Sequence, residues 1–426
     1  MNKKIALVSV SPRVGSGYGE GSLNLIDIFT KLGYEVCMLS LYGNQGYTDA
    51  IEVNDKIIKI YPVNQNLKNE KLVNIFDVYN LEQFDLVWGF YDLFAFGTDK
   101  YMQQHYFINS LMVDSEPFIP SNYPAYKGIN CALFMSNAAK DSVSKLDINK
   151  DKLLEYLPIP INDEDFYIEE DINRCKKDIY RHLGIKCEVR RLISVVAANA
   201  TDGGLERKNF YELLKWWGKH TEEEPNDYLY LHTDISGYGQ LGSNIKLLTK
   251  NLGINTKRIR FANNLNYSFG LYDREYMRLL YNSSDVMLVP SHSEGEGMPY
   301  IEASLCGCVC VGNNFQSGGE VIKNCKGELI ECRPNYYVQG AIKSKSYAED
   351  IDKAMKLALK RDRSIESRID IRLAALEHYS TTALLPKYDE LLQKAFKHKQ
   401  ELEEQIPIIS DNSEYDIKLG QKSEYK

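Results

Sequence analysis

The sequence predicts an α/β protein with two units, each built on a parallel sheet, that face each other across a cleft. Three observations support this fold class. Expected strands and helices alternate along the chain in two successive series. Residues 155–162 lie between the series and contain two prolines, which break regular structure and favour a domain boundary. The 426 residues are also enough for two separate hydrophobic cores.

The first series opens as a βαβ unit. Residues 5–10 form an apolar strand, a glycine-rich loop follows, and a helix from about residue 22 ends at Gly33, which suits a left-handed C-cap. The next strand is expected at 35–41. The rest of this series comprises three strands and one helix, expected at 84–89, 107–113, 129–136 and 137–146.

The second series predicts a second parallel sheet. Its strand at 285–290 is almost continuously apolar, as expected when both faces of a sheet are covered. The other strands are expected at 191–198, 228–232, 258–262 and 308–311. Two helices follow, at 347–360 and 382–399, and the residues from 401 onward are polar without periodicity. The predicted domains are therefore 1–162 and 163–376, followed by a C-terminal helix at 377–399 and a polar tail at 400–426.

The composition is that of a globular protein, with 44% hydrophobic and 26% charged residues. The net charge of −8 disfavours a nucleic-acid partner, whose phosphates attract basic surfaces. Residues 5–10 are too short for the apolar region of a signal peptide. Nine cysteines, an odd number without metal-ligand spacing, predict a reduced, cytoplasmic protein. Cys306, Cys308 and Cys310 are expected to be small buried residues.

The most informative segment is residues 290–303, which place Glu294 and Glu302 on either side of a glycine-rich helix start. Pro299 suits the first turn of that helix, and Gly307 suits the position that ends it. In open α/β sheets ligands bind at the carboxyl ends of strands, where N–H groups of a helix start attract anions. Carboxylates accept hydroxyl donors, so the pair can hold a sugar at one end of a diphosphate and a ribose at the other.

This segment resembles the E-x7-E signature of retaining glycosyltransferases with the GT-B fold, of the family 4 type (glycosyl transferases group 1). The resemblance extends upstream over 276–285 and downstream over 306–311 and the pair Gly318 and Gly319. It implies two Rossmann-like domains across a cleft and a C-terminal helix that packs back on the first domain. It also implies no essential metal and no side-chain nucleophile. The donor-binding residues predicted here are Glu294, Gly295, Gly297, Met298 and Glu302.

A second donor contact is predicted after the first strand. Gly15, Gly17 and Gly19 precede a helix, so their N–H groups can face the donor diphosphate or the acceptor. Dinucleotide-binding enzymes also carry a glycine loop at this place, but the usual G-x-G-x-x-G spacing is absent here. A tight strand-to-helix turn without a ligand is the alternative.

Cations for the leaving phosphate are predicted after residues 191–198. Lys208 opens the next helix beside Arg207, where positive charge neutralises a leaving phosphate. The pair resembles the phosphate clamp of the family, which usually has an arginine directly after the strand as well. Ala198 or Asn199 stands there instead, so either Arg207 or the backbone of 203–204 must supply the second contact. An exposed Arg-Lys pair at a helix start is the alternative.

An acid is predicted on the first-domain side of the cleft. Asp114 and Glu116 follow a strand, and members of the resembled family often place a histidine or an acid here against the transferred sugar. Either side chain can hold a sugar hydroxyl or orient the acceptor. The alternative is a turn or helix-cap residue.

Three further features have weaker interpretations. The Asp-x-Asp pattern at 163–165 is used by metal-dependent transferases of another fold, but it lies in the hinge, so no metal site is predicted. Trp216 and Trp217, flanked by lysines, suit a membrane interface, although a core position is favoured for one of them. Peripheral membrane contact is thus an alternative. His292 is expected either to contact the nucleotide or to cap a strand end.

The predicted function is a retaining glycosyltransferase that moves a hexose from a nucleoside diphosphate sugar to an acceptor hydroxyl, without a cofactor. Its predicted catalytic residues are Glu294, Lys208 and Asp114. The acceptor stays open among a glycan, a lipid-linked saccharide and a small molecule. One alternative is a dehydrogenase-like enzyme with a nicotinamide site at 15–19. The other is a degraded sugar-nucleotide-binding protein, motivated by the missing arginine.

Overall fold

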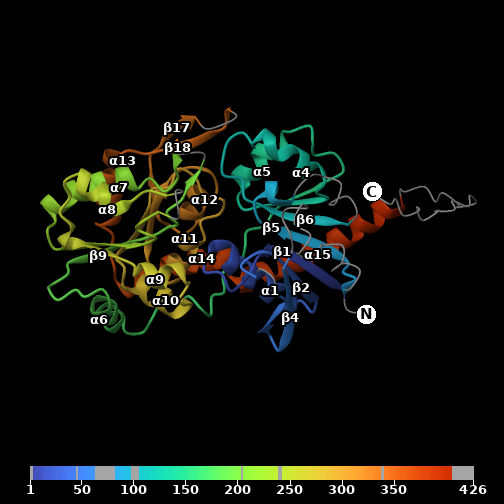
Figure 1. Cartoon of the computed structure of the whole chain (residues 1–426), viewed down its shortest axis with the longest axis horizontal. Helices are drawn as coiled ribbons and strands as arrows, with labels where there is room; N and C mark the ends of the chain where they lie inside the picture. Colours follow the sequence, from blue (N-terminus) through green and yellow to red (C-terminus); the bar gives the residue numbers. More distant parts are fainter. Residues whose placement is uncertain are drawn as a thin grey trace, which may run out of the picture.

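The structure, a computed structural model, describes residues 3–44, 47–62, 82–96, 105–202, 205–237, 242–336 and 340–404. Within these ranges the chain forms two large sheets that lie side by side in two lobes (Figure 1). Helices cover both faces of each sheet, as expected for α/β architecture. The predicted fold class is confirmed.

The first sheet has the strand order β3-β4-β2-β1-β5-β6-β7-β8. Neighbouring strands are parallel, except that β3 and β4 form an antiparallel hairpin at one edge. The strands are β1 (Lys4–Val10), β2 (Glu35–Tyr42), β3 (Asp49–Val53), β4 (Lys56–Pro62), β5 (Leu86–Phe90), β6 (Phe107–Leu111), β7 (Cys131–Phe134) and β8 (Leu153–Tyr156). The helices and 3₁₀ turns of this half are α1 (Gly17–Lys31), η1 (Leu93–Phe96), η2 (Pro120–Asn122), α4 (Tyr123–Lys127) and α5 (Asn137–Ser144).

The position of strand β1 between two hydrophobic cores explains why its sequence is largely apolar. Ile5 and Leu7 belong to a core shared with α1 and with the last helix, α15 (Thr381–Glu404). Ala6 and Val8, at the alternate positions, belong to a second core shared with α4 and α5. Successive side chains of a strand point to opposite faces, so a central strand covered on both sides needs an apolar residue at every position.

The last helix lies on the first sheet, at the far end of the chain from β1 (Figure 1). Tyr388 on α15 stacks on Trp88 of β5 with ring centroids 5.7 Å apart. Leu402 packs against the same core, which explains why the helix continues to Glu404 instead of ending near residue 399. The residues after Glu404, which include most of the predicted tail, lie outside the described part.

The second sheet has the strand order β13-β12-β9-β14-β15-β16, with all neighbours parallel. Its strands are β9 (Arg191–Val196), β12 (Asp227–His232), β13 (Ile259–Phe261), β14 (Val286–Val289), β15 (Val309–Asn313) and β16 (Glu328–Ile330). Its helices and 3₁₀ turn are α6 (Ile172–His182), α7 (Phe210–Glu223), α8 (Ile245–Asn251), η3 (Thr256–Arg258), α9 (Asn264–Ser268), α10 (Arg274–Ser283), α11 (Met298–Leu305), α12 (Gln316–Asn324), α13 (Ala348–Ala358) and α14 (Ile365–Tyr379). Two small antiparallel pairs accompany it, β10 (Thr201–Asp202) with β11 (Leu205–Glu206) and β17 (Arg333–Tyr336) with β18 (Ile342–Lys345).

Among the described residues, backbone hydrogen bonds join the two halves at three places. The chain crosses between them at Ile161 and again at Thr381, and these crossings lie side by side: Ile161 N–H donates to the Tyr379 carbonyl at 2.9 Å, and Thr381 N–H donates to the Ile161 carbonyl at 3.1 Å. The third junction pairs Ile342 of β18 with Glu116, through backbone hydrogen bonds of 2.7 and 2.9 Å. These contacts hold the carboxyl ends of both sheets toward one another.

Several elements differ from the sequence prediction. Helix α1 begins at Gly17 instead of about residue 22, because the Ser16 side chain accepts the Gly19 N–H at 3.1 Å and caps it. Strand β8 occupies part of the segment that the prolines were expected to keep irregular, and the β3–β4 hairpin and α14 were not predicted. Helix α14 also spans the predicted boundary at 376. Pro299 lies in the first turn of α11 and Gly307, with φ of 70°, follows its end, as predicted.

Candidate functional site

A cavity of about 910 Å³ lies between the two sheets. One wall comes from residues at or beyond the carboxyl ends of β1, β5 and β6, and the other from those of β9, β12 and β14. In α/β sheets this edge is where ligands bind. The cleft predicted from the sequence is therefore present.

The loop between β14 and α11 depends on its glycines. Gly297 has φ of 92°, and a Cβ there would lie 2.7 Å from the Tyr300 ring. A Cβ at Gly318 would lie 3.2 Å from the Glu294 side chain. Since an L side chain rarely adopts such a φ, the glycines allow the loop to fold tightly and place Glu294 on the cavity wall.

The loop that carries Arg207 and Lys208 is tied to the loop after β14. The Arg207 carbonyl accepts hydrogen bonds from the His292 N–H at 2.8 Å and from the Ser291 hydroxyl at 3.2 Å. Asn209 is the N-cap of α7 with φ of 57°. Lys208 thus stands just before the helix instead of opening it, and the left-handed turn after it directs the chain into α7.

Glu294 pairs with both predicted cations. Lys208 Nζ lies 2.5 Å from Glu294 Oε1, and Arg207 Nη1 lies 3.6 Å from Oε2. Burial favours a higher pKa for Glu294, but the charges of Lys208 and Arg207 outweigh it and hold the pKa below its usual value. Burial, together with the charge of Arg207, lowers the pKa of Lys208 to about 8. The cluster carries two cations for one carboxylate, which suits an anionic ligand.

Glu302 lies half-buried on α11 and lines the same cavity. Its Oε2 accepts a hydrogen bond from the Tyr281 hydroxyl at 2.8 Å. Burial raises the pKa of Glu302 to about 7, against the opposing effect of this hydrogen bond. Both carboxylates of the signature therefore line the cavity, Glu294 beside two cations and Glu302 with a pKa close to neutral pH.

Asp114 lies on the opposite wall and contacts the second half of the molecule. Its Oδ2 accepts hydrogen bonds from Lys343 Nζ at 2.7 Å and from the Ser293 hydroxyl at 3.3 Å. Lys343 belongs to β18, its side chain is only 1% exposed, and it also lines the cavity. The acid predicted after β6 thus meets the signature loop, and Lys343 brings an additional cation to the cleft.

Arg274 is a second cation that sequence reasoning missed. It stands at the start of α10 and lines the cavity. Its Nη2 lies 2.7 Å from Glu20 Oε2 on α1, and its Nη1 pairs with Asp165 in the linker. Nothing in the local sequence of Arg274 or Lys343 indicates a partner more than 200 residues away, so no sequence signal could have found either contact.

The remaining predicted residues divide into two groups. Those that line the cavity are Gly15, Gly17, Ala198, Gly295, Gly297 and Met298. Asn199 does not, because its amide group holds the carbonyls of Asp234 and Ser243 at 2.7 and 2.6 Å. Glu116 does not either, since it is exposed and only its backbone makes the junction with Ile342. The backbone of 203–204 lies outside the described residues.

Three aromatic residues singled out from the sequence are buried and do not line the cavity. His292 is buried and its Nδ1 lies 2.5 Å from the Ser344 carbonyl, away from the cavity lining. Trp216 and Trp217 are both buried in the core of the second sheet, where α7 packs against α13. The membrane-facing interpretation of this pair is therefore wrong, because tertiary packing covers both indole rings. No helix among the described residues is long and apolar enough to cross a membrane.

Glu296 is a buried acid within the signature that sequence reasoning did not single out. Its Oε1 accepts the Ile159 N–H at 2.8 Å, which ties the signature loop to the linker between the halves. Its Oε2 is buried without a hydrogen-bond partner in the described part of the chain. Burial raises the pKa of Glu296 well above its usual value, which favours the neutral form of this carboxyl group.

Residues 205–369, which contain Arg207, Lys208, Glu294 and Glu302, match the family model described as "Glycosyl transferases group 1". No curated protein matches the sequence. The match begins at β11, after β9, and ends within α14, and it includes both of the predicted donor-binding loops that carry charge.

Solved structures share the fold over nearly the whole chain. Sucrose-phosphate synthase from Thermosynechococcus elongatus is 17% identical with a TM-score of 0.69, over 93% of this chain and 100% of that chain. A glycosyltransferase from Rickettsia africae is 18% identical with a TM-score of 0.64, over 93% and 99%. HepE from Anabaena, in complex with UDP and glucose, is 11% identical with a TM-score of 0.63, over 92% and 100%. At these identities the likeness concerns the fold, which is GT-B.

Proposed function

We propose that this chain is a retaining glycosyltransferase that moves a hexose from a nucleoside diphosphate sugar to an acceptor hydroxyl. The match of residues 205–369 to group 1 glycosyltransferases and the GT-B fold support this proposal. The observation that carries the proposal is the cluster of Lys208, Arg207 and Glu294 on the cavity wall. A dehydrogenase-like enzyme, the earlier alternative, has no use for this cluster and is not supported by the family match.

The cations act on the leaving group. Cleavage of the bond between the anomeric carbon and the diphosphate leaves the electron pair, and hence negative charge, on the phosphate oxygen. Lys208 and Arg207 are the groups that stabilise this charge where it develops. Gly15, Gly17 and Met298 line the same cavity, and their N–H groups would add fixed dipoles in place of a metal ion.

The carboxylates orient the donor. Glu294 accepts hydrogen bonds from hydroxyls of the transferred sugar, and Glu302 accepts them from the ribose. The acceptor oxygen attacks the anomeric carbon on the face from which the diphosphate leaves, and its proton passes to the departing phosphate oxygen. Asp114 holds a sugar hydroxyl at the junction of donor and acceptor. Since HepE was solved with UDP and glucose, UDP-glucose is the first donor to test.

Calorimetric titration without added metal tests donor binding. UDP, GDP, ADP and NADH are titrated into the parent protein, Lys208→Ala and Glu302→Ala, with the exposed Lys219→Ala as the control. Loss of one charge-assisted contact is expected to lower the affinity about 10- to 150-fold, while Lys219→Ala binds like the parent. If no nucleoside diphosphate binds, or if both site variants bind normally, the assignment of the site is wrong.

One observation favours a second candidate, a donor-binding protein without turnover. Ala198 lines the cavity where the family clamp has an arginine. Release of nucleoside diphosphate from UDP-glucose distinguishes the two. Transfer or slow hydrolysis supports the enzyme, with Lys343 and Arg207 supplying the second cation, whereas tight binding without any release supports the degraded site.

We also place the enzyme in the cytoplasm. All nine cysteines are free, and most of them are buried. Burial raises the pKa of Cys37 and Cys308 to about 12, so these thiols are unreactive and persist in the reduced state. Localisation of a tagged full-length chain tests this assignment.

A further inference from the structure

We propose that the acceptor of this transferase is an uncharged, hydroxyl-bearing molecule with an apolar face, such as a neutral saccharide, and not a phosphorylated sugar. This inference rests on the proposed function, because it concerns the half of the cavity that the donor does not need. It names the charge class of the second substrate, which neither the fold nor the family match determines.

The charges of the cavity are divided unequally between its two walls. Among the described lining residues, the first-sheet wall contributes three acids, Glu20, Asp92 and Asp114, and no lysine, arginine or histidine. The cations Arg207, Lys208, Arg274 and Lys343 all come from the second wall. A ligand that occupies the first wall therefore meets carboxylates.

The cations of the second wall already have partners in this arrangement. Arg274 is held by Glu20 and Asp165, and Lys343 by Asp114. Arg207 and Lys208 lie on the donor side beside Glu294. A phosphate on the acceptor would have to displace one of these ion pairs or lie against the acids, and both alternatives disfavour it.

The same pairing argues against a cationic acceptor. The carboxylates of Glu20 and Asp114 are matched by Arg274 and Lys343. Asp92 accepts a hydrogen bond from the Tyr18 hydroxyl at 2.9 Å, which fixes its orientation. Burial, with the charge of Asp92, raises the pKa of Tyr18 well above its usual value, so the phenol remains a neutral donor.

The rest of this wall suits the alternating polar and apolar faces of a sugar ring. Leu93, Phe118 and Ile119 provide apolar surface, and the Phe118 ring stacks with Tyr123 at 6.0 Å between centroids. Asn122 and Asp92 provide amide and carboxylate groups on the same wall. Carboxylates and amides accept hydroxyl hydrogens, while apolar side chains cover the C–H face.

A matched acceptor panel tests the proposal with the protein as it is. Glucose, galactose, mannose and N-acetylglucosamine are each compared with the 6-phosphate and, for the hexoses, with the 2-amino sugar. The donor is the sugar nucleotide whose nucleoside diphosphate binds in calorimetry. The rate of nucleoside diphosphate release is measured with and without each acceptor. At least one neutral saccharide is expected to accelerate release, with kcat/KM at least tenfold above that of its charged counterparts.

Substitution of the wall sharpens the test. Ser121→Lys places a cation at an exposed position of the first-sheet wall. The ratio of kcat/KM for the phosphorylated over the neutral acceptor is expected to rise about tenfold or more. Ser121→Gln, of similar length without charge, is the control and is expected to leave the ratio unchanged. Asp92→Asn is expected to raise the KM for the neutral acceptor more than it changes donor affinity.

Each outcome decides the matter. Preference for a phosphorylated or an amino sugar, or the absence of acceleration by any neutral saccharide while the donor binds and is hydrolysed, overturns the inference and leaves the proposed function intact. An unchanged ratio in Ser121→Lys also counts against it. If no nucleoside diphosphate binds and no donor is consumed, the proposed function fails first and this inference falls with it.

Discussion

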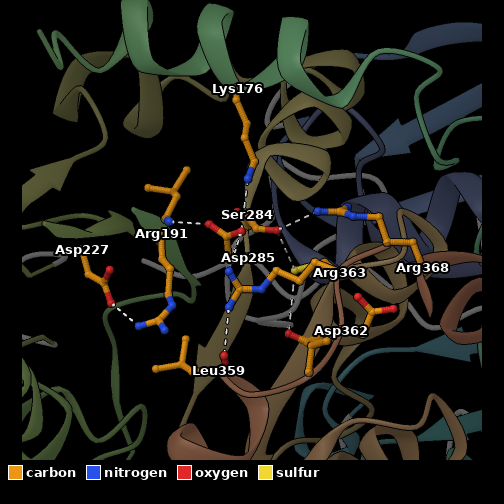
Figure 2. Close-up of polar contacts among 12 residues, drawn as sticks. Lys176, Arg191, Asp227, Ser284, Asp285, Leu359, Asp362, Arg363 and Arg368 are labelled. Atoms are coloured by element: carbon orange, nitrogen blue, oxygen red, sulfur yellow. Dashed lines mark hydrogen bonds and ion pairs between the residues drawn. The ribbon is translucent and has the colours of Figure 1, made fainter. Parts of the chain in front are cut away.

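Two carboxylates stand at opposite ends of β14, the buried Asp285 and the half-buried Glu294, and resemble each other chemically. Asp285 precedes the strand, and Leu192 N–H donates to it at 2.7 Å while Lys176 and Arg363 each lie 3.1 Å away (Figure 2). Glu294 follows the strand and also has two cations. Each acid is thus paired with positive charge from other elements of the second half.

The difference between them is what else they face. The groups around Asp285 are backbone and side chains of the protein itself, at the amino end of the sheet, and Asp285 lies outside the cavity lining. Glu294, Lys208 and Arg207 face a cavity at the carboxyl end. A paired acid is therefore not by itself a sign of a ligand-binding site in this fold. The position of the acid at the carboxyl edge of the sheet is the distinguishing feature.

The largest expected effect is a loss of folding stability when Asp285 is replaced. Asp285→Ala leaves Lys176, Arg363 and the Leu192 N–H without their shared partner. Removing one member of a buried charged network costs about 3–5 kcal/mol, measured as the free energy of unfolding in urea. Nucleotide affinity of the remaining folded protein is expected to be unchanged. Asp352→Ala, which removes an exposed pair with Lys356 within α13, is the control and should leave the midpoint nearly in place.

Replacement of Lys208, beside Glu294, is expected to have the opposite pattern, with a large effect on nucleotide affinity and a small effect on unfolding. Lys208→Met is expected to reduce nucleoside diphosphate affinity about 10- to 150-fold. Its effect on unfolding should be clearly smaller than that of Asp285→Ala, because burial already disfavours the charged form of Lys208. Lys219→Met controls for the loss of a lysine. A Lys208→Met protein that unfolds as easily as Asp285→Ala but binds normally would place Lys208 with the structural cluster.

The pH dependence of binding gives a third, intermediate effect. In the proposed donor complex the ribose hydroxyls favour the ionised form of Glu302, whose pKa burial raises to about 7. The affinity is therefore expected to fall up to about tenfold per pH unit below 7. The pH dependence of the free energy of unfolding has the opposite sign. Because the pKa of Glu302 is raised from 4.5 to about 7 on folding, its contribution to stability is fully present below pH 4.5 and is lost as the pH rises through 7. Calorimetry and urea unfolding between pH 5.5 and 8 measure both.

Glu302→Gln is the matched variant for this effect. The terminal phosphate of the ligand titrates near pH 6 with either protein, so the difference between the two pH profiles isolates Glu302. Parallel profiles of the parent and the variant would show that Glu302 does not meet the nucleotide.

The smallest effect is expected at Glu296. Because burial favours the neutral form of Glu296 and its carboxyl group accepts the Ile159 N–H, Glu296→Gln keeps the acceptor and should change the free energy of unfolding by less than about 1 kcal/mol. Glu296→Ala leaves the N–H without a partner and should cost about 1–3 kcal/mol. Urea unfolding at pH 7 measures both variants. A large loss in Glu296→Gln would mean that the group is ionised and belongs with Asp285 and Glu294.

The parts of the fold and site that could be predicted are those encoded in consecutive residues. Pro299 and Gly307 marked the ends of α11, and continuous apolar runs marked β1 and β14. Glu294 and Lys208 were found because each stands in a short, recognisable pattern directly after a strand. In contrast, α1 begins earlier than predicted, because a single capping hydrogen bond at Ser16 outweighs the unfavourable glycines of its first turn.

The sequence by itself determined the fold class, the two charged loops at the cavity and the carboxylate pair, because strand and helix periodicity and glycine conformations act over a few residues. Only the tertiary structure decided which cations and acids meet. Lys343 reaches Asp114 across 229 positions of the chain, and Arg274 reaches Glu20 across 254. Such contacts follow from how two separately folded sheets are docked at their carboxyl edges, and electrostatic pairing over that distance leaves no periodicity in the residues around either partner.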